Sequence, residues 1–376
     1  MKKIILTLFL AVVLVTACFA AKKVIVTVSN PLKMDRNNEM VEIQKSAIIK
    51  ILGLKSDEQF IILNSKNEQV PYQISCQPAA KIIFPATVKP YGTSVYIVQK
   101  GTAQTYVPKV YGRLVPERKD DFTWENDRVA FRVYGPALQA TGEVSSGIDV
   151  WSKRTDKLVI NKWYADELAG KKTYHTDGGE GLDMYKVGPT LGAGAAAPYV
   201  DDKLWFSKNF VKHQVLENGP LRMTVKLEYA PFLAGDTEVT ETRIISLDAG
   251  SQLNKITLNY SLKGTSLPIA TGIVMRNSSE EKIDVSSSKN YFLHAEPEDS
   301  ANGIIYTAVV SAKPFLSIEK KNGHILGVQN AKPNEKYVYY QGAGWSKWGF
   351  STFEDWKKYV SDFSLKLHKP LVVKVK

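Results

Sequence analysis

The chain has 376 residues, 44% of them hydrophobic, and a formal net charge of +11. This length and composition suffice for two or three domains' worth of buried core, which excludes an intrinsically disordered protein. The basic residues are spread without a long Lys/Arg run, so we expect no nucleic-acid partner.

Residues 1–20 have the pattern of a bacterial export signal. Lys2 and Lys3 precede a short apolar run, and small residues follow it. The run is too short for a stable transmembrane helix. The tetrad that ends at Cys18 resembles a lipobox, which implies a lipid anchor on that residue, and ordinary cleavage after Ala20 is the alternative. We therefore predict an exported protein, either periplasmic or a membrane-anchored lipoprotein.

Cys76 is the only other cysteine, so no disulfide forms within the mature chain if Cys18 is lipidated or lost. The protein must then be held together by core burial. For an exported basic protein, the natural acidic partners are anionic glycans or the membrane surface. Simple solubility explains the net charge equally well, and the oligomeric state is left open.

Residues 22–107 read as a small N-terminal β-sandwich. Short β-rich runs alternate with turns of Asn, Pro, Gly and Lys. The predicted strands are Lys23–Val28, Met40–Ile43, Phe60–Leu63, Lys81–Phe84 and Ser94–Gln99. The polar segment 108–121 contains two prolines and is predicted as a linker.

Residues 122–376 form a second, larger β-rich region. Apolar and polar residues alternate cleanly over 221–229 and 255–262, which predicts two half-buried antiparallel strands. The turn Asp248–Ser251 joins the second of these to the strand before it. Further strands are expected near 303–310, 324–328 and 337–341. One late helix follows, with an aromatic stripe from Phe353 and a capping box of Thr352 and Asp355.

The segment 175–198 is the most unusual part of the chain. It gathers reactive side chains among glycines, which favour an irregular loop over a helix or strand. The candidate catalytic residues are His175, Asp177, Glu180, Asp183 and Tyr185. A surface loop with merely solvated carboxylates is the alternative.

Three reactions are compatible with these residue types. A lyase acting on a uronate needs a cation for the carboxylate, a base for the C5 proton and an acid for the leaving oxygen, with His175 and Tyr185 as base and acid. A hydrolase would use two of Asp177, Glu180 and Asp183 as a carboxyl pair. An epimerase would pair His175 with a carboxylate. Calcium bound by the Asp177–Asp183 loop is a further alternative.

Two other clusters offer contacts to a saccharide. Arg128, Arg132 and Tyr134 are expected on one strand face, where arginines could clamp a carboxylate, unless they form structural salt bridges with Glu125 or Glu143. The glycine-flanked segment with Trp345, Lys347 and Trp348 could stack a sugar ring, although at least one tryptophan should belong to the core. His213, just before a predicted strand, could also face the site.

Sequence motifs for phosphate-binding loops, zinc proteases, redox CxxC sites and nucleophile elbows are absent. We therefore expect no cofactor and no bound metal apart from the calcium alternative.

The order of several motifs resembles a family known only as a domain of unknown function. These are the segments 124–137, 175–194, Asn209-Phe210, Asn218–Arg222 and 342–347. Members of that family resemble exported proteins of glycan-degrading bacteria, found near enzymes for pectin and other uronate polysaccharides. The resemblance adds Arg222 to the candidate binding residues.

The pattern at 227–229 and 243–253 also resembles the β-supersandwich of galactose-mutarotase-like proteins. The predicted fold is therefore mainly β, with a small N-terminal β-sandwich followed by a large galactose-mutarotase-like β-supersandwich and one C-terminal helix. The predicted function is action on an anionic oligo- or polysaccharide, by a lyase or a hydrolase. A non-catalytic glycan-binding lipoprotein and a sugar epimerase are the alternatives, because fold alone does not decide among them.

Overall fold

The computed structural model describes residues 22–55, 58–75, 79–143 and 145–376. The predicted signal peptide at 1–20, with Cys18, and also Cys76 lie outside these residues. Within the described part of the chain, none of the helices combines the length and the apolar character that crossing a membrane requires.

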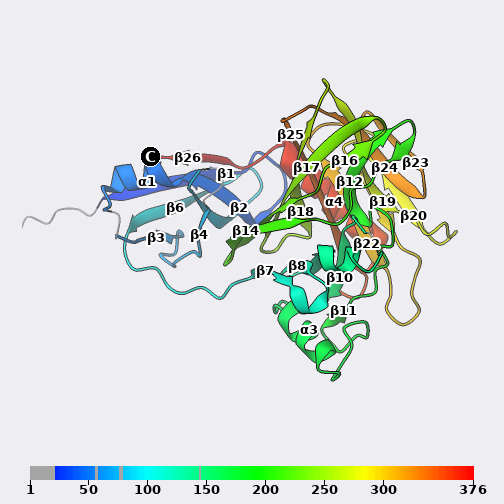
Figure 1. The fold of residues 1–376 in the computed structure, drawn as a ribbon. Helices are drawn as coiled ribbons and strands as arrows, with labels where there is room; N and C mark the ends of the chain where they lie inside the picture. Colours follow the sequence, from blue (N-terminus) through cyan, green and yellow to red (C-terminus); the bar gives the residue numbers. More distant parts are fainter. Residues whose placement is uncertain (1–21, 56–57, 76–78, 144) are drawn as a thin grey trace, which may run out of the picture.

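The fold is mainly β, as predicted, and its two parts lie side by side (Figure 1). The smaller part packs a four-stranded sheet against a three-stranded sheet. Alternate valines of its first strand, Val24, Val26 and Val28, are fully buried between the sheets. The elements are β1 (Lys23–Ser29), β2 (Arg36–Gln44), α1 (Lys45–Leu52), β3 (Phe60–Leu63), β4 (Gln73–Ser75), β5 (Lys81–Val88), β6 (Thr93–Lys100) and the C-terminal β26 (Val372–Val375).

Two segments differ from the predicted domain boundaries. Strand β26 pairs antiparallel with β1, so the end of the chain returns to the small sandwich. Strand β7 (Val110–Val115) lies inside the predicted linker 108–121, yet it pairs over its whole length with β8 (Asp121–Asn126). The β1–β26 pairing joins residues far apart in the sequence, whereas β7 and β8 form a local hairpin closed by residues 116–120.

The larger part contains two five-stranded sheets and one nine-stranded sheet. One five-stranded sheet has the order β11-β10-β9-β8-β7, and the other has the order β13-β12-β19-β24-β23. The remaining strands are β9 (Val129–Val133), β10 (Asp149–Lys153), β11 (Gly181–Leu182), β12 (Ala193–Val200), β13 (Lys203–Leu204), β14 (Lys212–Asn218), β15 (Arg222–Glu228), β16 (Phe232–Ala234), β17 (Thr237–Asp248), β18 (Leu253–Leu262), β19 (Leu267–Val274), β20 (Lys282–Val285), β21 (Tyr291–Ala295), β22 (Ile305–Ser311), β23 (Ser317–Lys321), β24 (His324–Ala331) and β25 (Lys336–Trp345).

The predicted alternation appears in the nine-stranded sheet. Met223, Val225 and Leu227 of β15 are fully buried, and β18 follows the same rule with Ile256 and Leu258. The opposite face of these strands carries polar side chains. An antiparallel sheet with one face in the core and one face toward water has this pattern.

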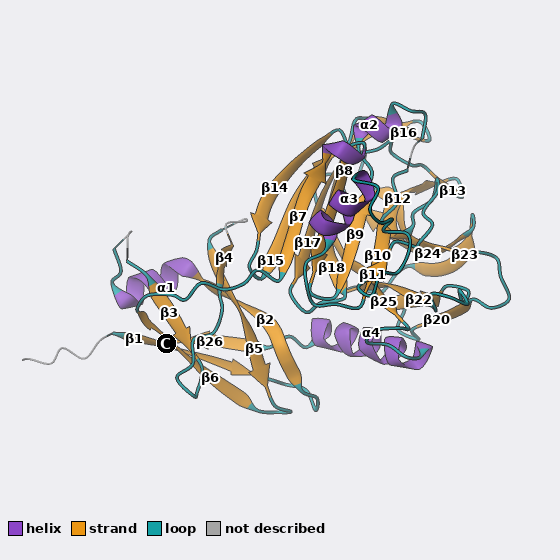
Figure 2. Ribbon diagram, turned by 90° about the horizontal axis from the view of Figure 1, so that it is seen from below, coloured by secondary structure: helices purple, strands orange, loops and turns teal. Residues whose placement is uncertain are grey.

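Helices cover selected faces of the larger part (Figure 2). The predicted late helix is α4 (Phe353–His368), which begins with the Thr352 and Asp355 capping box and packs on β21 and β22. Helix α3 (Ile160–Leu168) lies over the sheet of β7 to β11, with Trp163 and Tyr164 packed on Trp151 of β10. The short helix η1 (Pro116–Arg118) lies between β7 and β8 in the sequence, and α2 (Pro136–Gln139) lies between β9 and β10.

Candidate functional site

The first half of the segment 175–198 is a loop fixed to the edge of the sheet beneath α3. Gly181 pairs with Lys153 across β11 and β10 and has a φ of +119°. A Cβ atom added at Gly181 would lie 2.0 Å from the carbonyl oxygen of Ser152. Only glycine therefore allows the loop to approach β10 this closely.

The end of the predicted loop, from Ala193 to Pro198, belongs to a strand. β12 pairs antiparallel with β19, and seven of its eight residues, from Ala193, are buried. Small alanine side chains covered on both faces leave no alternation of apolar and polar residues, which is why the sequence did not indicate a strand. The reactive side chains of the segment are thus confined to 175–185.

Arg132 lies at the centre of a buried cluster of three aspartates. Its Nη2 atom is 2.6 Å from Oδ2 of Asp149 and donates a hydrogen bond of 2.8 Å to Oδ2 of Asp183. Its Nη1 atom is 3.9 Å from Oδ2 of Asp121. Strand register explains the arrangement, because Asp149 of β10 sits opposite Arg132 of β9 on the face covered by α3. Arg132 is therefore already neutralised, which differs from the free carboxylate clamp that the sequence suggested.

Among the residues that the structure describes, Arg132 also forms no salt bridge with Glu125 or Glu143, the partners that the sequence offered as the alternative. Glu125 pairs with the buried Lys153 at 2.7 Å and accepts hydrogen bonds from the backbone N–H groups at the start of α3. Glu143 is exposed.

The cluster around Arg132 contains three carboxyl groups, and their pKa values are raised. Burial raises the pKa of Asp121 to about 7, although the Arg132 guanidinium opposes the shift. Burial and the neighbouring Asp149 also raise the pKa of Asp183 well above its usual range. Neither carboxyl oxygen of Asp121 has a hydrogen-bond partner among the described residues. Burial and repulsion among the three carboxyls therefore favour a protonated carboxyl in this cluster.

His175 lies at the surface next to this cluster, with a side chain that is 54% exposed. Its Nδ1 atom is 2.9 Å from the main-chain oxygen of Asp183 and 3.8 Å from the Asp183 carboxylate. A carbonyl oxygen can only accept, so Nδ1 carries the proton in the neutral ring, and Nε2 has the free lone pair. The ring also packs against Tyr174, with 4.5 Å between centroids.

Tyr185 belongs to a second buried polar group behind the loop. Its hydroxyl has no hydrogen-bond partner in the described part of the chain, and the Arg276 guanidinium lies 5.0 Å from its ring centroid. Arg276 binds Glu296 at 2.6 Å, and Nδ1 of His294 is 3.7 Å from that carboxylate. Sequence reasoning missed Arg276 and Glu296, which adjoin different strands and share no local motif.

Asp177 and Glu180 point to other partners. Asp177 pairs with Arg154 at 2.9 Å and accepts hydrogen bonds from the N–H groups of Gly179 and Gly181, which makes it a loop-forming residue. Glu180 pairs with Lys162 of α3 at 2.6 Å. The three loop carboxylates thus have separate cations and do not form the pair expected for a hydrolase. Across the described residues, no group of three or more acidic, His or Cys side chains is placed to hold a metal ion.

The tryptophan segment contributes a shallow depression of about 230 Å³, including the open solvent above it, lined by Arg128, Trp345 and Trp348 among others. Trp345 is buried and donates a hydrogen bond to the main-chain oxygen of Asn302, so it belongs to the core as expected. Trp348 is half-buried. Lys347 binds the main-chain oxygen of Ala301. Arg128 precedes β9 and is exposed here, away from Arg132.

Tyr134 stays with Arg132, whose guanidinium is 5.2 Å from its ring centroid. His213 packs near Phe122 and Phe210, at 5.8 and 6.4 Å between centroids, in a setting typical of a structural histidine.

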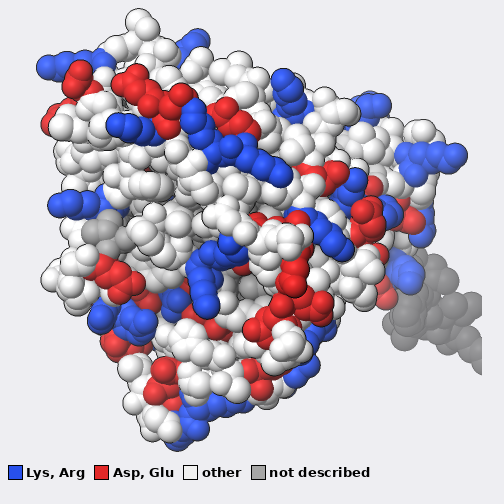
Figure 3. Space-filling view, turned by 90° about the vertical axis from the view of Figure 1, so that its right-hand side faces the viewer, with Lys and Arg blue, Asp and Glu red and all other residues white. Residues whose placement is uncertain are grey.

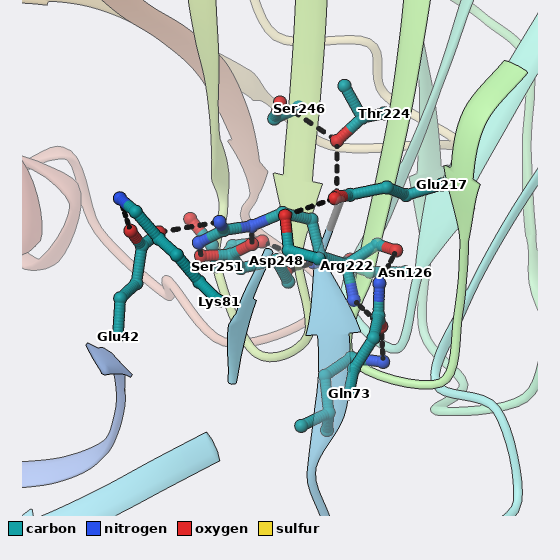
Figure 4. A network of polar contacts seen from close by, with 12 residues as sticks. Glu42, Gln73, Lys81, Asn126, Glu217, Arg222, Thr224, Ser246, Asp248 and Ser251 are labelled. Atoms are coloured by element: carbon teal, nitrogen blue, oxygen red, sulfur yellow. Dashed lines mark hydrogen bonds and ion pairs between the residues drawn. The ribbon is translucent and has the colours of Figure 1, made fainter. Parts of the chain in front are cut away.

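Arg222 connects the two parts of the molecule (Figure 4). It forms two contacts with Asp248, at 2.5 and 2.9 Å, and one of 2.6 Å with Glu42 of the small sandwich. Gln73 of β4 adds hydrogen bonds to the backbone of Leu221 and Arg222. Arg222 therefore serves the interface between the two parts.

Surface charge is mixed on the face near β20, β23 and β24. Acidic and basic side chains are interspersed there, without a field of one sign (Figure 3). The net positive charge therefore does not form a basic surface on this side.

Comparison with known proteins decides the family. The family model described as a domain of unknown function, DUF4861, matches residues 28–373. The chain belongs to the DUF4861 family. "Uncharacterized protein P7" of Formosa agariphila is 31% identical to this DUF4861 chain over 402 residues, with all of both chains covered.

Solved structures show a related fold. An α-mannosidase from Enterococcus faecalis V583 matches 95% of the DUF4861 chain with a TM-score of 0.51 and 7% identity. A glycosyl hydrolase family 38 protein from Enterococcus faecalis matches 95% with a TM-score of 0.52 and 8% identity. The chain spans about half of each structure, 46% and 48%. At this identity the likeness concerns the fold alone.

Proposed function

We propose that this chain is an exported enzyme that cleaves uronate-containing, pectin-like saccharides by β-elimination. The observation that carries the proposal is the fixed His175 ring, exposed at the surface and bound through Nδ1 to Asp183. In the reaction, Nε2 of His175 takes the C5 proton of a uronate, a C4–C5 double bond forms, the C4–O bond breaks, and the leaving oxygen takes up a proton.

The surroundings support this assignment. Asp183 is held by Arg132, so the histidine is oriented by a rigid, buried anchor. Arg276 is partly exposed, and we assign it to the uronate carboxylate, which it would bind beside its existing ion pair with Glu296. Tyr185 is buried, so we add the half-buried Tyr134, which lies beside Arg132, as a second candidate proton donor.

A hydrolase is the second candidate. The observation that favours it is Asp121, a buried carboxyl whose pKa is raised by burial to about 7, next to the carboxylates of Asp149 and Asp183. A protonated carboxyl beside an ionised one is the pairing that glycosidases use. The aspartates are buried in this conformation, so hydrolysis requires the cluster to open.

A glycan-binding lipoprotein without catalysis is the third candidate. It is favoured by the shallow depression at Arg128, Trp345 and Trp348 and by the lipobox-like sequence at Cys18.

The experiment incubates the purified mature chain with oligogalacturonides in heavy-oxygen water and analyses the products by mass spectrometry. Elimination gives unsaturated products that carry no heavy oxygen from bond cleavage, whereas hydrolysis introduces one heavy oxygen atom per cleaved bond. Measurable affinity without any product from acidic or neutral oligosaccharides would favour the binding protein and overturn the enzyme.

A further inference from the structure

A cleft separates the small sandwich from the polar face of the nine-stranded sheet. It encloses about 1340 Å³, including its open mouth. One side is formed by Glu42, Ser75 and Lys81 of the small sandwich. The opposite side is the outward face of β15, β17, β18 and β25.

Strand register places a polar row along this face. Thr224, Ser246, Lys255 and Tyr340 sit directly opposite one another across the four strands. Thr257 and Lys336 lie on the same face of β18 and β25, further along the strands. Antiparallel sheets often show a polar face to water, but here a second folded unit covers it and turns it into a wall of a cleft.

The carboxylates in the cleft are already satisfied. Burial of Glu42 would by itself raise the pKa of its carboxyl, but hydrogen bonds from Lys81 and Arg222 outweigh that effect and lower the pKa to about 2. Glu217 accepts hydrogen bonds from the hydroxyls of Ser75 and Thr224, and Asp248 is bound by Arg222 (Figure 4). These groups do not compete for a cation that enters the cleft.

Positive charge is left over. Across residues 22–55, 58–75, 79–143 and 145–376, Lys255 and Lys336 form no ion pair, and both are exposed. The lining cations outnumber the lining anions, since Lys81, Arg222, Lys255 and Lys336 face Glu42, Glu217 and Asp248. The cleft therefore favours an anionic ligand.

An aromatic ring completes the wall. Tyr340 is half-buried opposite Lys255 and is held edge-on by Phe363 of α4, with 5.1 Å between ring centroids. A fixed aromatic ring beside ammonium groups and hydroxyls suits a ligand with an apolar sugar face and a carboxylate.

We infer that this cleft binds an acidic oligosaccharide at a site separate from the His175 loop, where it would hold part of a longer chain. The inference rests on the proposed function for its choice of a uronate ligand. A long saccharide that is bound in this cleft would have a higher local concentration at the His175 loop.

The test measures binding of tetragalacturonate to the full mature chain by calorimetry, with the neutral tetrasaccharide maltotetraose as comparison. The variant carries Lys255→Ala and Lys336→Ala together. The control carries Lys263→Ala and Lys313→Ala, two exposed lysines outside the cleft. Thermal unfolding checks that each variant is folded.

We expect binding of tetragalacturonate with little binding of maltotetraose, and a Kd about five- to tenfold weaker in the cleft variant, because each exposed charge contact contributes modestly. The control should match the wild type. The inference would be overturned if the cleft variant and the control variant bound tetragalacturonate with equal Kd. It would also be overturned if inorganic sulfate, compared per negative charge, competed as well as tetragalacturonate. Binding without cleavage would contradict the proposed function alone. Cleavage by a protein whose Kd is unchanged by Lys255→Ala and Lys336→Ala would contradict this inference alone.

Discussion

The Nδ1 atom of His175 lies 2.9 Å from the main-chain oxygen of Asp183, and the Asp183 carboxylate is in turn bound by Arg132. This relationship joins an exposed proton-accepting ring to a buried charged cluster. The ring gains a defined tautomer and orientation from a contact that does not use its Nε2 atom. The proposed role of His175 as a base depends on this contact.

Replacing His175 by Gln removes the proposed base and keeps a polar side chain. We expect a loss of about a hundredfold or more in kcat on oligogalacturonides, with the thermal unfolding midpoint nearly unchanged, because the ring is exposed. Lys171→Ala, an exposed position in the same region, is the matched control and should retain full activity. Equal rates for the two variants would remove His175 from the mechanism.

Asp121→Asn should change how stability depends on pH. Burial raises the pKa of Asp121 from 3.8 to about 7, so between these values the folded state keeps a proton that the unfolded state has lost. The wild type therefore loses stability as the pH rises through this window, by up to about 4 kcal/mol from this group. The variant lacks this loss, so it should gain relative to the wild type from pH 4 to 7 in urea unfolding. A constant difference across that range would contradict the raised pKa.

Arg132→Ala should be strongly destabilising. It leaves Asp149 and Asp183 buried without their cation, which costs about 3–5 kcal/mol when a buried pair is broken from one side. Arg154→Ala is the comparison, because Arg154 pairs with Asp177 at a more exposed site, and its loss should cost less than about 1 kcal/mol. Chemical denaturation measures both. Similar costs would mean that the cluster is not held by Arg132.

Gly181→Ala tests how the loop is positioned. The added Cβ would meet the carbonyl oxygen of Ser152 at 2.0 Å, on top of the strain of a positive φ. Gly179→Ala is a matched control with a φ of +99° and no atom within 4 Å of the added Cβ. We expect Gly181→Ala to lower both stability, by about 1–3 kcal/mol, and activity, and Gly179→Ala to do so much less. Identical behaviour would mean that close packing on β10 does not position the loop.

Local periodicity explains what the sequence predicted well. The alternation around Met223 and Ile256 defined two strands, and the Thr352 and Asp355 capping box defined the start of α4. In each case the signal lies within a few residues, where the side chains that share a face or a cap are close in the sequence.

Long-range pairing explains what the sequence did not predict. Strand β26 joins β1 across nearly the whole chain, and β12 is covered on both faces, so neither shows a local pattern. The candidate site shows the same limit. His175, Asp183 and Tyr185 could be found because they are neighbours in one unusual loop, whereas the neutralisation of Arg132 by Asp149 follows from strand register.

The most direct test of the central claim is ultraviolet absorbance of unsaturated products during incubation of the mature chain with oligogalacturonides, for the wild type and His175→Gln. We expect a steady rise of absorbance for the wild type and almost none for the variant. A flat trace for the wild type on every uronate oligosaccharide tested, or an equal rise for the folded variant, would contradict this claim.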